Sequence, residues 1–159
     1  MTITANNTQS VAEVVRATLE RHGLVKDELI PILNEVNQVL GYLPAEALEL
    51  VAQEMKVPQS QLFSVASFYN MLSTKPRGRH VIQFCESAPC HVVGGRQVFE
   101  TLKRELKLES GETSTDGKWT LVTTSCLGVC AVGPVLIVDN DIFGNVTPAQ
   151  VPDILARYH

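Results

Sequence analysis

The four cysteines of the chain come as two pairs, and this arrangement constrains the fold more than any other feature of the sequence. Cys85 and Cys90 are separated by four residues, and Cys126 and Cys130 by three. Each pair directly follows a segment that is predicted to be a β-strand, over residues 80–84 and 119–124. Because strand ends in one sheet can point to the same edge, we expect both loops to converge there. Four thiolates at one place suit either an iron–sulfur cluster or zinc.

Three kinds of cysteine chemistry compete for this pattern. Disulfides or inert buried thiols are disfavoured, because nothing in the sequence indicates an oxidising compartment. Structural zinc usually takes tighter loops such as Cys-x2-Cys. A [2Fe–2S] cluster suits the wider loops of this chain, because each iron takes two thiolates and the sulfides need N–H donors. His91, next to Cys90, could be a Rieske-type ligand, but four cysteines are already available.

The first part of the chain is predicted to be helical. Four segments up to about residue 70 place apolar side chains at helical spacing, and each presents a single apolar stripe. We expect N-caps at Ser10 and Asp27, helix ends at Gly23 and Gly41, and helix starts at Pro44 and Pro58. Helices with one apolar face each are expected to pack together as a small bundle.

The pattern of residues changes after the turn-rich segment 73–78. Strands are predicted at 80–84, 119–124 and 134–138, with a hairpin turn at Asn140–Asp141 leading into Ile142–Phe143. Helical spacing predicts a helix over 91–106 and another near Pro148, and the polar segment 109–118 is predicted to be a surface loop. This order indicates a two-layer α/β unit. We therefore expect two domains, a helical bundle at 1–76 and an α/β domain at 77–159.

Composition and charge exclude several classes of protein. A hydrophobic fraction of 45% and a charged fraction of 19% are those of a globular chain with a core. The formal net charge is -4 and no basic stripe is present, so nucleic acid is not an expected partner. The uncharged stretch 119–138 is interrupted by polar residues and Gly133-Pro134, which argues against membrane insertion. The polar N-terminus does not resemble a secretory signal, and we expect a cytoplasmic protein.

The sequence carries no motif for nucleotide or hydrolytic chemistry. It has neither a Gly-x-Gly-x-x-Gly after a strand nor a Walker loop. No Ser/His/Asp or paired-carboxylate arrangement presents itself either. We therefore do not expect the chain to be a hydride-handling enzyme on its own.

An ordered set of short motifs runs from Gly41 to the C-terminus. The motifs are Gly41-Tyr-Leu-Pro-Ala-Glu-Ala47, Val65-Ala-Ser-Phe-Tyr69, Lys75-Pro-Arg-Gly78, Cys85-x4-Cys90-His91, Cys126-Leu-Gly-Val-Cys130, Gly133-Pro134 and Gly144-x-Val-Thr-Pro148. In these motifs the chain resembles the thioredoxin-like [2Fe–2S] ferredoxin family. That family supplies the small iron–sulfur subunit of NADH:quinone oxidoreductase (complex I) and of related NAD(P)-linked hydrogenases and formate dehydrogenases.

The resemblance implies a fold, a cofactor and partners. The fold would be a thioredoxin-like mixed four-stranded sheet with two helices, preceded by the helical bundle, so that 77–159 becomes the [2Fe–2S] domain. Cys85 and Cys90 would bind one iron of a single [2Fe–2S] cluster, and Cys126 and Cys130 the other. FMN and NAD(H) would be bound only by a larger flavoprotein subunit, within a complex that can hold further iron–sulfur, hydrogenase or dehydrogenase subunits. The chain would then relay single electrons, without being catalytic alone, in the cytoplasm or peripheral to a membrane through that complex.

Alternatives to this function stay open on the sequence. A free-standing [2Fe–2S] ferredoxin or, with less support, a zinc-binding interaction module would use the same four cysteines. The residues Phe63, Phe68, Tyr69 and Met71 belong either to the core of the bundle or to an interface with the flavoprotein subunit. The short basic run of Lys75, Arg77 and Arg79 is interpreted as a solvated linker rather than a docking patch.

Overall fold

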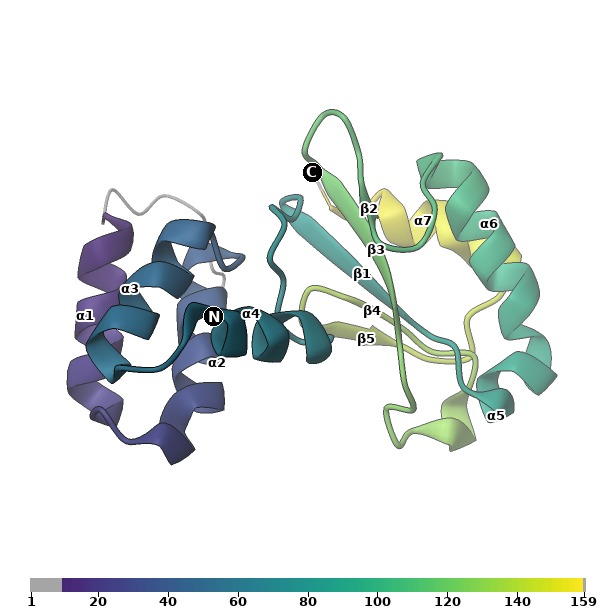
Figure 1. Ribbon diagram of the computed structural model, residues 1–159. Helices are drawn as coiled ribbons and strands as arrows, with labels where there is room; N and C mark the ends of the chain where they lie inside the picture. Colours follow the sequence, from purple (N-terminus) through teal and green to yellow (C-terminus); the bar gives the residue numbers. More distant parts are fainter. Residues whose placement is uncertain (1–9, 159) are drawn as a thin grey trace. The chain divides into compact units, whose positions relative to one another are not determined.

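The computed structural model of the chain describes residues 10–158, and contacts within the chain divide it into two compact units, Met1–Pro76 and Arg77–His159 (Figure 1). The helices of the first unit are α1 (Val11–His22), the short 3-10 helix η1 (Lys26–Glu28), α2 (Leu29–Leu40), α3 (Ala45–Met55) and α4 (Gln59–Phe68). The strands of the second unit are β1 (His80–Cys85), β2 (Glu112–Thr113), β3 (Trp119–Thr124), β4 (Leu136–Val138) and β5 (Asp141–Phe143). Its helical segments are α5 (Ala88–Cys90), η2 (His91–Gly95), α6 (Arg96–Leu106), η3 (Cys130–Val132), η4 (Pro148–Gln150) and α7 (Val151–Leu155).

Local chemistry sets most helix boundaries in the first unit. Ser10 caps α1 as predicted, in a capping box in which the Glu13 N–H donates to Ser10 Oγ (3.3 Å) and the Ser10 N–H donates to Glu13 Oε2 (3.0 Å). Gly41 ends α2 in the left-handed region, at φ +81°. The predicted N-cap at Asp27 is wrong, because Asp27 lies inside η1 and α2 follows directly from that turn. Within residues 10–158, no helix has the length and apolar run needed to cross a membrane.

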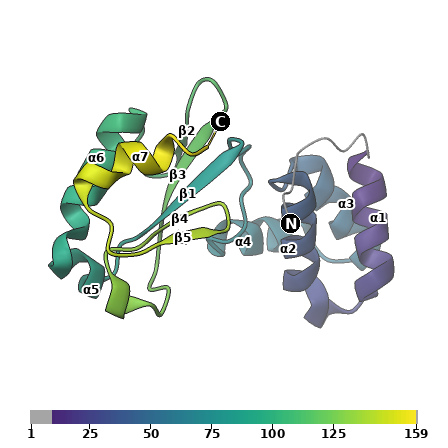
Figure 2. The ribbon, with the colours of Figure 1, turned by 180° about the vertical axis from the view of Figure 1, so that it is seen from behind.

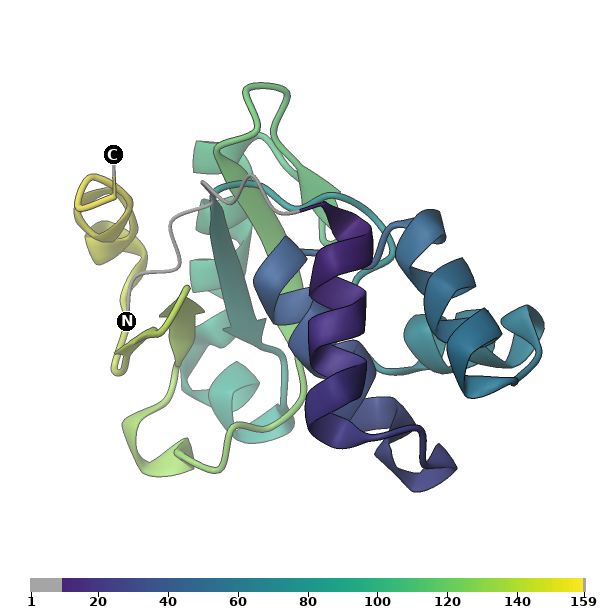
Figure 3. The same ribbon diagram turned by 90° about the vertical axis from the view of Figure 1, so that its left-hand side faces the viewer.

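The core of the first unit lies between the apolar stripes of its helices. Helix α1 packs against α2 and α3, and α3 packs against α4 (Figure 3). The residues that are almost fully buried include Val15, Ile32, Leu33, Val36, Leu43, Val51 and Leu62. Removing such side chains from water stabilises the bundle by about 1.5–3 kcal/mol for each residue. The helical stripes read from the sequence are therefore the packed faces of the unit.

The second unit is built on a five-stranded sheet with the order β2-β3-β1-β4-β5. Strands β1 and β3 are parallel, whereas the other neighbouring pairs are antiparallel. The mixed α/β fold is as expected, but the sheet has one strand more than the four predicted. The extra strand, β2, falls in the segment 109–118 that was predicted to be a loop. Both of its residues are exposed, so it has no apolar alternation that a sequence could reveal.

Helices α6 and α7 contact each other and cover one face of this sheet (Figures 1 and 2). The core beneath them is formed by almost fully buried residues such as Ile82, Phe84, Val98, Leu102, Leu121, Leu136 and Val151. The Phe84 ring on β1 stacks on Phe99 of α6, with the ring centroids 5.2 Å apart. This packing holds the sheet as a rigid base for the loops at its ends.

The helix predicted over 91–106 is broken near its start. The backbone of Val93 and Gly94 is not helical, and Gly94 has φ +103°. Helix α6 therefore begins only at Arg96, while α5 ends at Cys90. The break permits a close approach, because a Cβ on Gly95 would lie 2.6 Å from the Cys90 carbonyl oxygen. The turn between α5 and α6 thus packs tightly behind Cys90.

Candidate functional site

The parallel pair β1 and β3 brings the two cysteine loops to one edge of the sheet. Cys85 is the last residue of β1 and stands in register with Thr124, the last residue of β3. The Glu86 N–H donates to the Thr124 carbonyl oxygen at 3.1 Å, and this bond joins the two chains where they leave the sheet. Figures 1 and 2 show α5 and the loop after β3 at this same end of the unit. The expected convergence of the loops is therefore present.

The first pair of thiols is buried. Cys85 and Cys90 are 2% and 1% exposed and pack with Val135. The Cys85 N–H donates to the Val135 carbonyl oxygen at 3.1 Å. This bond fixes the end of β1 to the segment before β4. The His91 N–H donates to the Ser87 carbonyl oxygen at 3.0 Å and closes the short turn that carries Cys90.

The second pair of thiols is exposed. The Sγ atoms of Cys126 and Cys130 lie 3.4 Å apart. The Gly128 N–H points at Cys126 Sγ at 3.4 Å, the kind of backbone donor that a metal-bound sulfur accepts. Gly128 adopts φ +79°, which a residue with a side chain rarely does, and this conformation turns the loop around the sulfur.

Glycine also brings the two loops into contact. A Cβ on Gly133 would lie 3.2 Å from Cys90 Sγ and 3.3 Å from Val93 Cγ2. The segment that follows Cys130 therefore rests directly on the buried thiol of the first loop. Because glycine has only a hydrogen atom in place of a side chain, the two loops have the space that they need to pack against each other.

The electrostatics of the thiols link the two pairs. Burial raises the pKa of Cys85, but hydrogen bonds from backbone N–H groups of Ser87 and Leu127 and from the Cys90 thiol outweigh it, so its pKa is lowered. Burial, and then the neighbouring Cys85, raise the pKa of Cys90. The contact with Cys126 raises the pKa of Cys130, and the charge of Cys85 adds to this effect. The charges of Cys85 and Cys130 thus act from one cysteine loop on a thiol of the other loop.

The donor set of this site fits a two-iron cluster. Four thiols at a sheet edge are the soft ligands that iron–sulfur centres take. The thiols stand as two pairs, Cys85 with Cys90 and Cys126 with Cys130, and a [2Fe–2S] cluster divides its ligands in this way. His91, the weaker candidate ligand, is exposed.

Exposed valines lie next to the cysteines in both loops. Val92 and Val93 are 85% and 55% exposed in the turn after Cys90, and Val129 and Val132 flank Cys130. We refer to these four residues as the valine rim. Val92 and Val93 fall within the helix that was predicted over 91–106. The two valines stand directly before two glycines, which disfavour a helix. This is the sequence signal that could have distinguished Val92 and Val93 from the buried apolar face of that helix.

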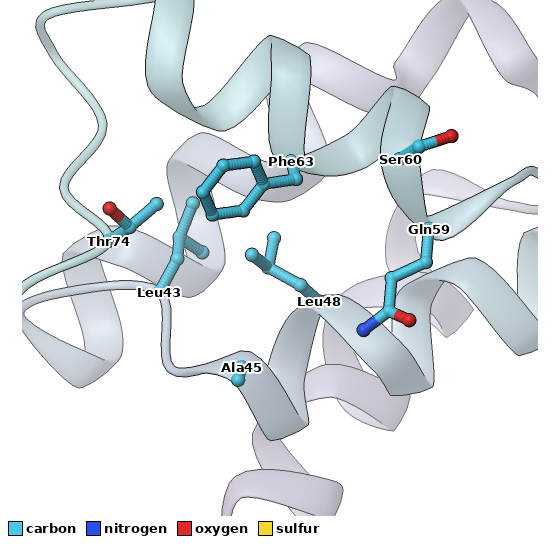
Figure 4. Close-up of a pocket in the computed structure, with 7 residues that line it drawn as sticks. All are labelled: Leu43, Ala45, Leu48, Gln59, Ser60, Phe63 and Thr74. Atoms are coloured by element: carbon cyan, nitrogen blue, oxygen red, sulfur yellow. The ribbon is translucent and has the colours of Figure 1, made fainter.

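The aromatic residues at the end of α4 are mainly on the surface. Phe63, Phe68 and Met71 are exposed, with Phe68 at 78%, so their interpretation as bundle core is wrong. Tyr69 is partly buried and packs against the core of the unit. Beside Phe63 lies a pocket of about 410 Å³, into which Leu43 and Leu48 also point (Figure 4). Exposed apolar side chains next to a hollow are typical of an interaction surface.

In the basic run, Lys75 and Arg79 are exposed, as the predicted solvated linker requires, but Arg77 is not. Burial lowers the pKa of Arg77, and this residue is half-buried. The Gly78 N–H donates to Thr120 Oγ1 at 2.6 Å, and the Arg79 N–H donates to the Gly117 carbonyl oxygen at 2.9 Å. The run is therefore anchored to β3 and the turn before it.

Known proteins match the chain along most of its length. The family model of the thioredoxin-like [2Fe–2S] ferredoxin matches residues 15–159. The HndA subunit of the NADP-reducing hydrogenase of Solidesulfovibrio fructosivorans is 35% identical over 150 residues, which cover 94% of this chain and 85% of that protein. A subunit of the NADH-quinone oxidoreductase of Escherichia coli K12 is 36% identical over 129 residues, 81% of this chain and 78% of that protein.

A solved structure is similar in fold. In the crystal structure of the air-oxidized NAD+-reducing [NiFe]-hydrogenase, one chain superposes with a TM-score of 0.71 at 19% sequence identity. The superposition covers 82% of this chain but only 22% of the hydrogenase chain. At this identity the likeness shows the fold that the two chains share.

Proposed function

The chain belongs to the thioredoxin-like [2Fe–2S] ferredoxin family, and we propose that it is the electron-transfer subunit of an NAD(P)H-linked oxidoreductase complex. In this proposal Cys85 and Cys90 bind one iron of a single cluster, and Cys126 and Cys130 bind the other. The observation that carries the proposal is the parallel pairing of β1 and β3, which places Cys85 beside Thr124 and so brings the starts of the two cysteine loops side by side. Residues 77–159 are then the cluster-binding domain and residues 1–76 a helical domain.

The residues around the thiols suit the storage and exchange of one electron. When bound, a [2Fe–2S] cluster accepts and returns single electrons. The burial of Cys85 and Cys90 disfavours added negative charge and so lowers the reduction potential. The Gly128 N–H, which points at Cys126 Sγ, acts in the opposite direction by stabilising charge on that sulfur. Electrons would pass through the side of Cys126 and Cys130, because these two thiols are exposed.

The proposed partner is a larger flavoprotein subunit that binds FMN and NAD(H). This chain has no nucleotide-binding motif, so the hydride chemistry of such a complex belongs to another chain. Two of its relatives are named as subunits, one of an NADP-reducing hydrogenase and the other of an NADH-quinone oxidoreductase. The valine rim gives the partner an apolar surface beside the thiols, and Phe63, Phe68 and Met71 give a second one on the helical domain.

Co-purification tests this proposal against a free-standing ferredoxin and a zinc module. The native protein is isolated anaerobically from its host through an affinity tag, and its iron, sulfide, zinc and FMN are measured. We expect roughly two irons and two sulfides for each copy of the chain, together with a flavoprotein. A stable monomer without flavin would contradict the subunit role, and a colourless protein with one zinc would contradict the cluster.

The ligand assignment is tested with two matched variants. Cys126→Ser should lose most of its iron, because it removes one of four thiolates and ligation contributes to the folding free energy of such a site. Ser125→Ala changes the neighbouring loop residue without removing a sulfur and should keep its iron. A Cys126→Ser protein with full iron content and an unchanged paramagnetic spectrum in the reduced state would show that this assignment is wrong.

A further inference from the structure

We propose that Cys126 and Cys130 form a reversible disulfide when the chain has no cluster, so that reduction of this pair controls cluster loading. The second half of this inference rests on the proposed function, whereas the first half concerns only the thiols themselves. It makes the loop 126–130 a redox-sensitive site within the cluster-binding domain.

The distance between the two sulfurs supports a disulfide. The Sγ atoms of Cys126 and Cys130 are 3.4 Å apart, so a disulfide requires them to approach by about 1.4 Å. The loop between them is outside the sheet and turns at Gly128, where φ is +79°. A movement of this size can be absorbed by side-chain and loop rotations, without any change in β1 or β3.

The two pairs of thiols differ in how accessible they are to an oxidant in solution. Cys126 and Cys130 are exposed, whereas Cys85 and Cys90 are 2% and 1% exposed beneath Val135. A thiol must meet the sulfur of its oxidant directly, so a buried thiol reacts slowly whatever its chemistry. Cys90 is further covered by Gly133, whose backbone lies against its sulfur. An oxidant in solution will therefore react with the second pair first.

The oxidant in this proposal is a low-molecular-weight disulfide such as oxidised glutathione. One cysteine thiolate attacks a sulfur of the oxidant, which forms a mixed disulfide and releases one small thiolate. The second cysteine thiolate attacks the mixed disulfide, forms the bond between Cys126 and Cys130, and releases the second small thiolate. Two electrons pass from the pair to the oxidant, and the two released thiolates take up the protons that the pair has lost.

The disulfide removes half of the thiolates that a cluster needs. Each iron of a [2Fe–2S] cluster takes two thiolates, and the oxidised chain can offer only Cys85 and Cys90. A dithiol reductant reverses the exchange and restores all four ligands. Cys126 and Cys130, through which electrons would pass when the cluster is bound, thus control the uptake of iron when the cluster is absent.

The sequence makes the disulfide straightforward to locate. Trypsin cuts after Arg79, Arg96, Lys118 and Arg157, so one peptide, 80–96, carries Cys85 and Cys90, and another, 119–157, carries Cys126 and Cys130. The full-length chain is freed of metal anaerobically, reduced, exposed to oxidised glutathione, alkylated and digested. We expect peptide 119–157 to become lighter by two hydrogen atoms and to resist alkylation. Peptide 80–96 should be oxidised at least about tenfold more slowly.

Variants and a denatured sample make the result decisive. Cys130→Ser should stop at a glutathione adduct on Cys126, because the resolving thiol is missing. In denaturant the preference for one peptide should disappear, since the burial of Cys85 and Cys90 is lost. Peptides 80–96 and 119–157 linked to each other, peptide 80–96 oxidised first, or the same products from native and denatured chain would each overturn the inference.

Iron uptake separates this inference from the proposed function. The oxidised chain should take up less than a tenth of the iron that the reduced chain takes up, and a dithiol should restore uptake. If the reduced chain takes up no iron, the proposed function fails while the disulfide stands. If the oxidised chain loads iron as well as the reduced one does, the control of loading is wrong and the proposed function stands.

Discussion

Single residues decide how closely the two cysteine loops approach. Gly133 lies against the Cys90 thiol, Gly95 lies against the Cys90 carbonyl, and Gly128 turns the loop around Cys126. Three glycines therefore set the spacing around the sulfurs. A side chain at the first two positions would occupy space that the loops already fill, and at the third it would force a strained backbone.

Gly133→Ala tests this spacing. The added methyl group would lie 3.2 Å from Cys90 Sγ and 3.3 Å from Val93 Cγ2, so one of the loops must move. We expect the free energy of unfolding to fall by about 1–3 kcal/mol and the iron content to fall with it. Thermal or denaturant unfolding and iron analysis measure both effects. Val132→Ala, which removes atoms from the neighbouring residue, is the control, and equal values for the two variants would contradict the explanation.

His22 is a second residue whose surroundings determine its chemistry. Its Nδ1 lies 3.1 Å from Glu28 Oε2, and its Nε2 lies 2.7 Å from Glu35 Oε2. Carboxylates only accept hydrogen bonds, so both contacts are satisfied only by the imidazolium form. Arg21 forms an ion pair with the same Glu35. The hydrogen bond with Glu35, and then the one with Glu28, raise the pKa of His22 above 6.5.

This shift predicts a pH dependence of stability. Because the folded pKa is raised, the stabilisation by His22 is fully present below pH 6.5 and is lost as the pH rises through the folded pKa. A pH titration of the His22 imidazole by proton NMR should give a midpoint above pH 6.5 in the full chain. Glu35→Gln should lower this midpoint. Glu49→Gln, on an exposed position of α3, should leave the midpoint unchanged. A midpoint at or below 6.5 in the native chain would contradict the prediction.

At the scale of elements, buried polar contacts join segments that are far apart in sequence. The clearest case is Asn37 on α2, whose side chain is buried. Asn37 Oδ1 accepts a hydrogen bond from the Ser73 N–H at 3.0 Å, and its Nδ2 lies 3.5 Å from the Met71 carbonyl oxygen. The Leu43 N–H donates to the Ser73 carbonyl oxygen at 2.6 Å. These bonds hold the segment after α4 against α2 and the start of α3.

Asn37→Ala should destabilise the protein by about 1–3 kcal/mol, because it leaves the backbone groups of Ser73 and Met71 without their buried partner. Gln38→Ala changes the adjacent, exposed residue of α2 and should shift stability by no more than about 0.5 kcal/mol. Denaturant unfolding followed by circular dichroism measures both. A loss of less than about 0.5 kcal/mol for Asn37→Ala would show that this contact does not hold the segment.

At the scale of the whole molecule, each of the two units has an exposed apolar surface. The second unit has the valine rim beside the thiols, and the first has Phe63, Phe68 and Met71 beside a pocket. Exposed apolar side chains that form a continuous patch are typical of contacts with another chain.

Val92→Asp tests the role of this rim in the proposed complex. A carboxylate at this position, which is 85% exposed in the free chain, would be desolvated when a partner covers it. We expect binding to the flavoprotein subunit to weaken at least about tenfold, or about 1.4 kcal/mol, with iron content unchanged. Ile142→Asp places the same charge on the exposed residue of the edge strand β5 and should have no effect. Isothermal titration measures both, and equal affinities would show that the partner binds elsewhere.

The features that the sequence predicts best are those governed by neighbouring residues. The N-cap at Ser10, the helix end at Gly41 and the strand at 119–124 depend on local hydrogen bonds and on local alternation, and all three are confirmed. The cysteine pairs lie at strand ends, close to the predicted positions, with Cys85 as the last residue of β1 and Cys126 two residues after β3. The hairpin turn, predicted at Asn140–Asp141, lies one residue earlier, because Asp139 rather than Asn140 adopts the left-handed conformation.

By itself, the sequence of this protein determined most of its elements, its two pairs of thiols and the edge where they could meet. Only the tertiary structure decided which surfaces are covered. It broke the helix over 91–106 at Val93 and Gly94, where the turn lets Gly95 pack against the Cys90 carbonyl, and it added β2, because β3 supplies the hydrogen-bonding partner. It also buried Cys85 and Cys90 while leaving Cys126, Cys130 and Phe68 exposed. Burial depends on what packs against a residue from distant parts of the chain, and no local pattern carries that information.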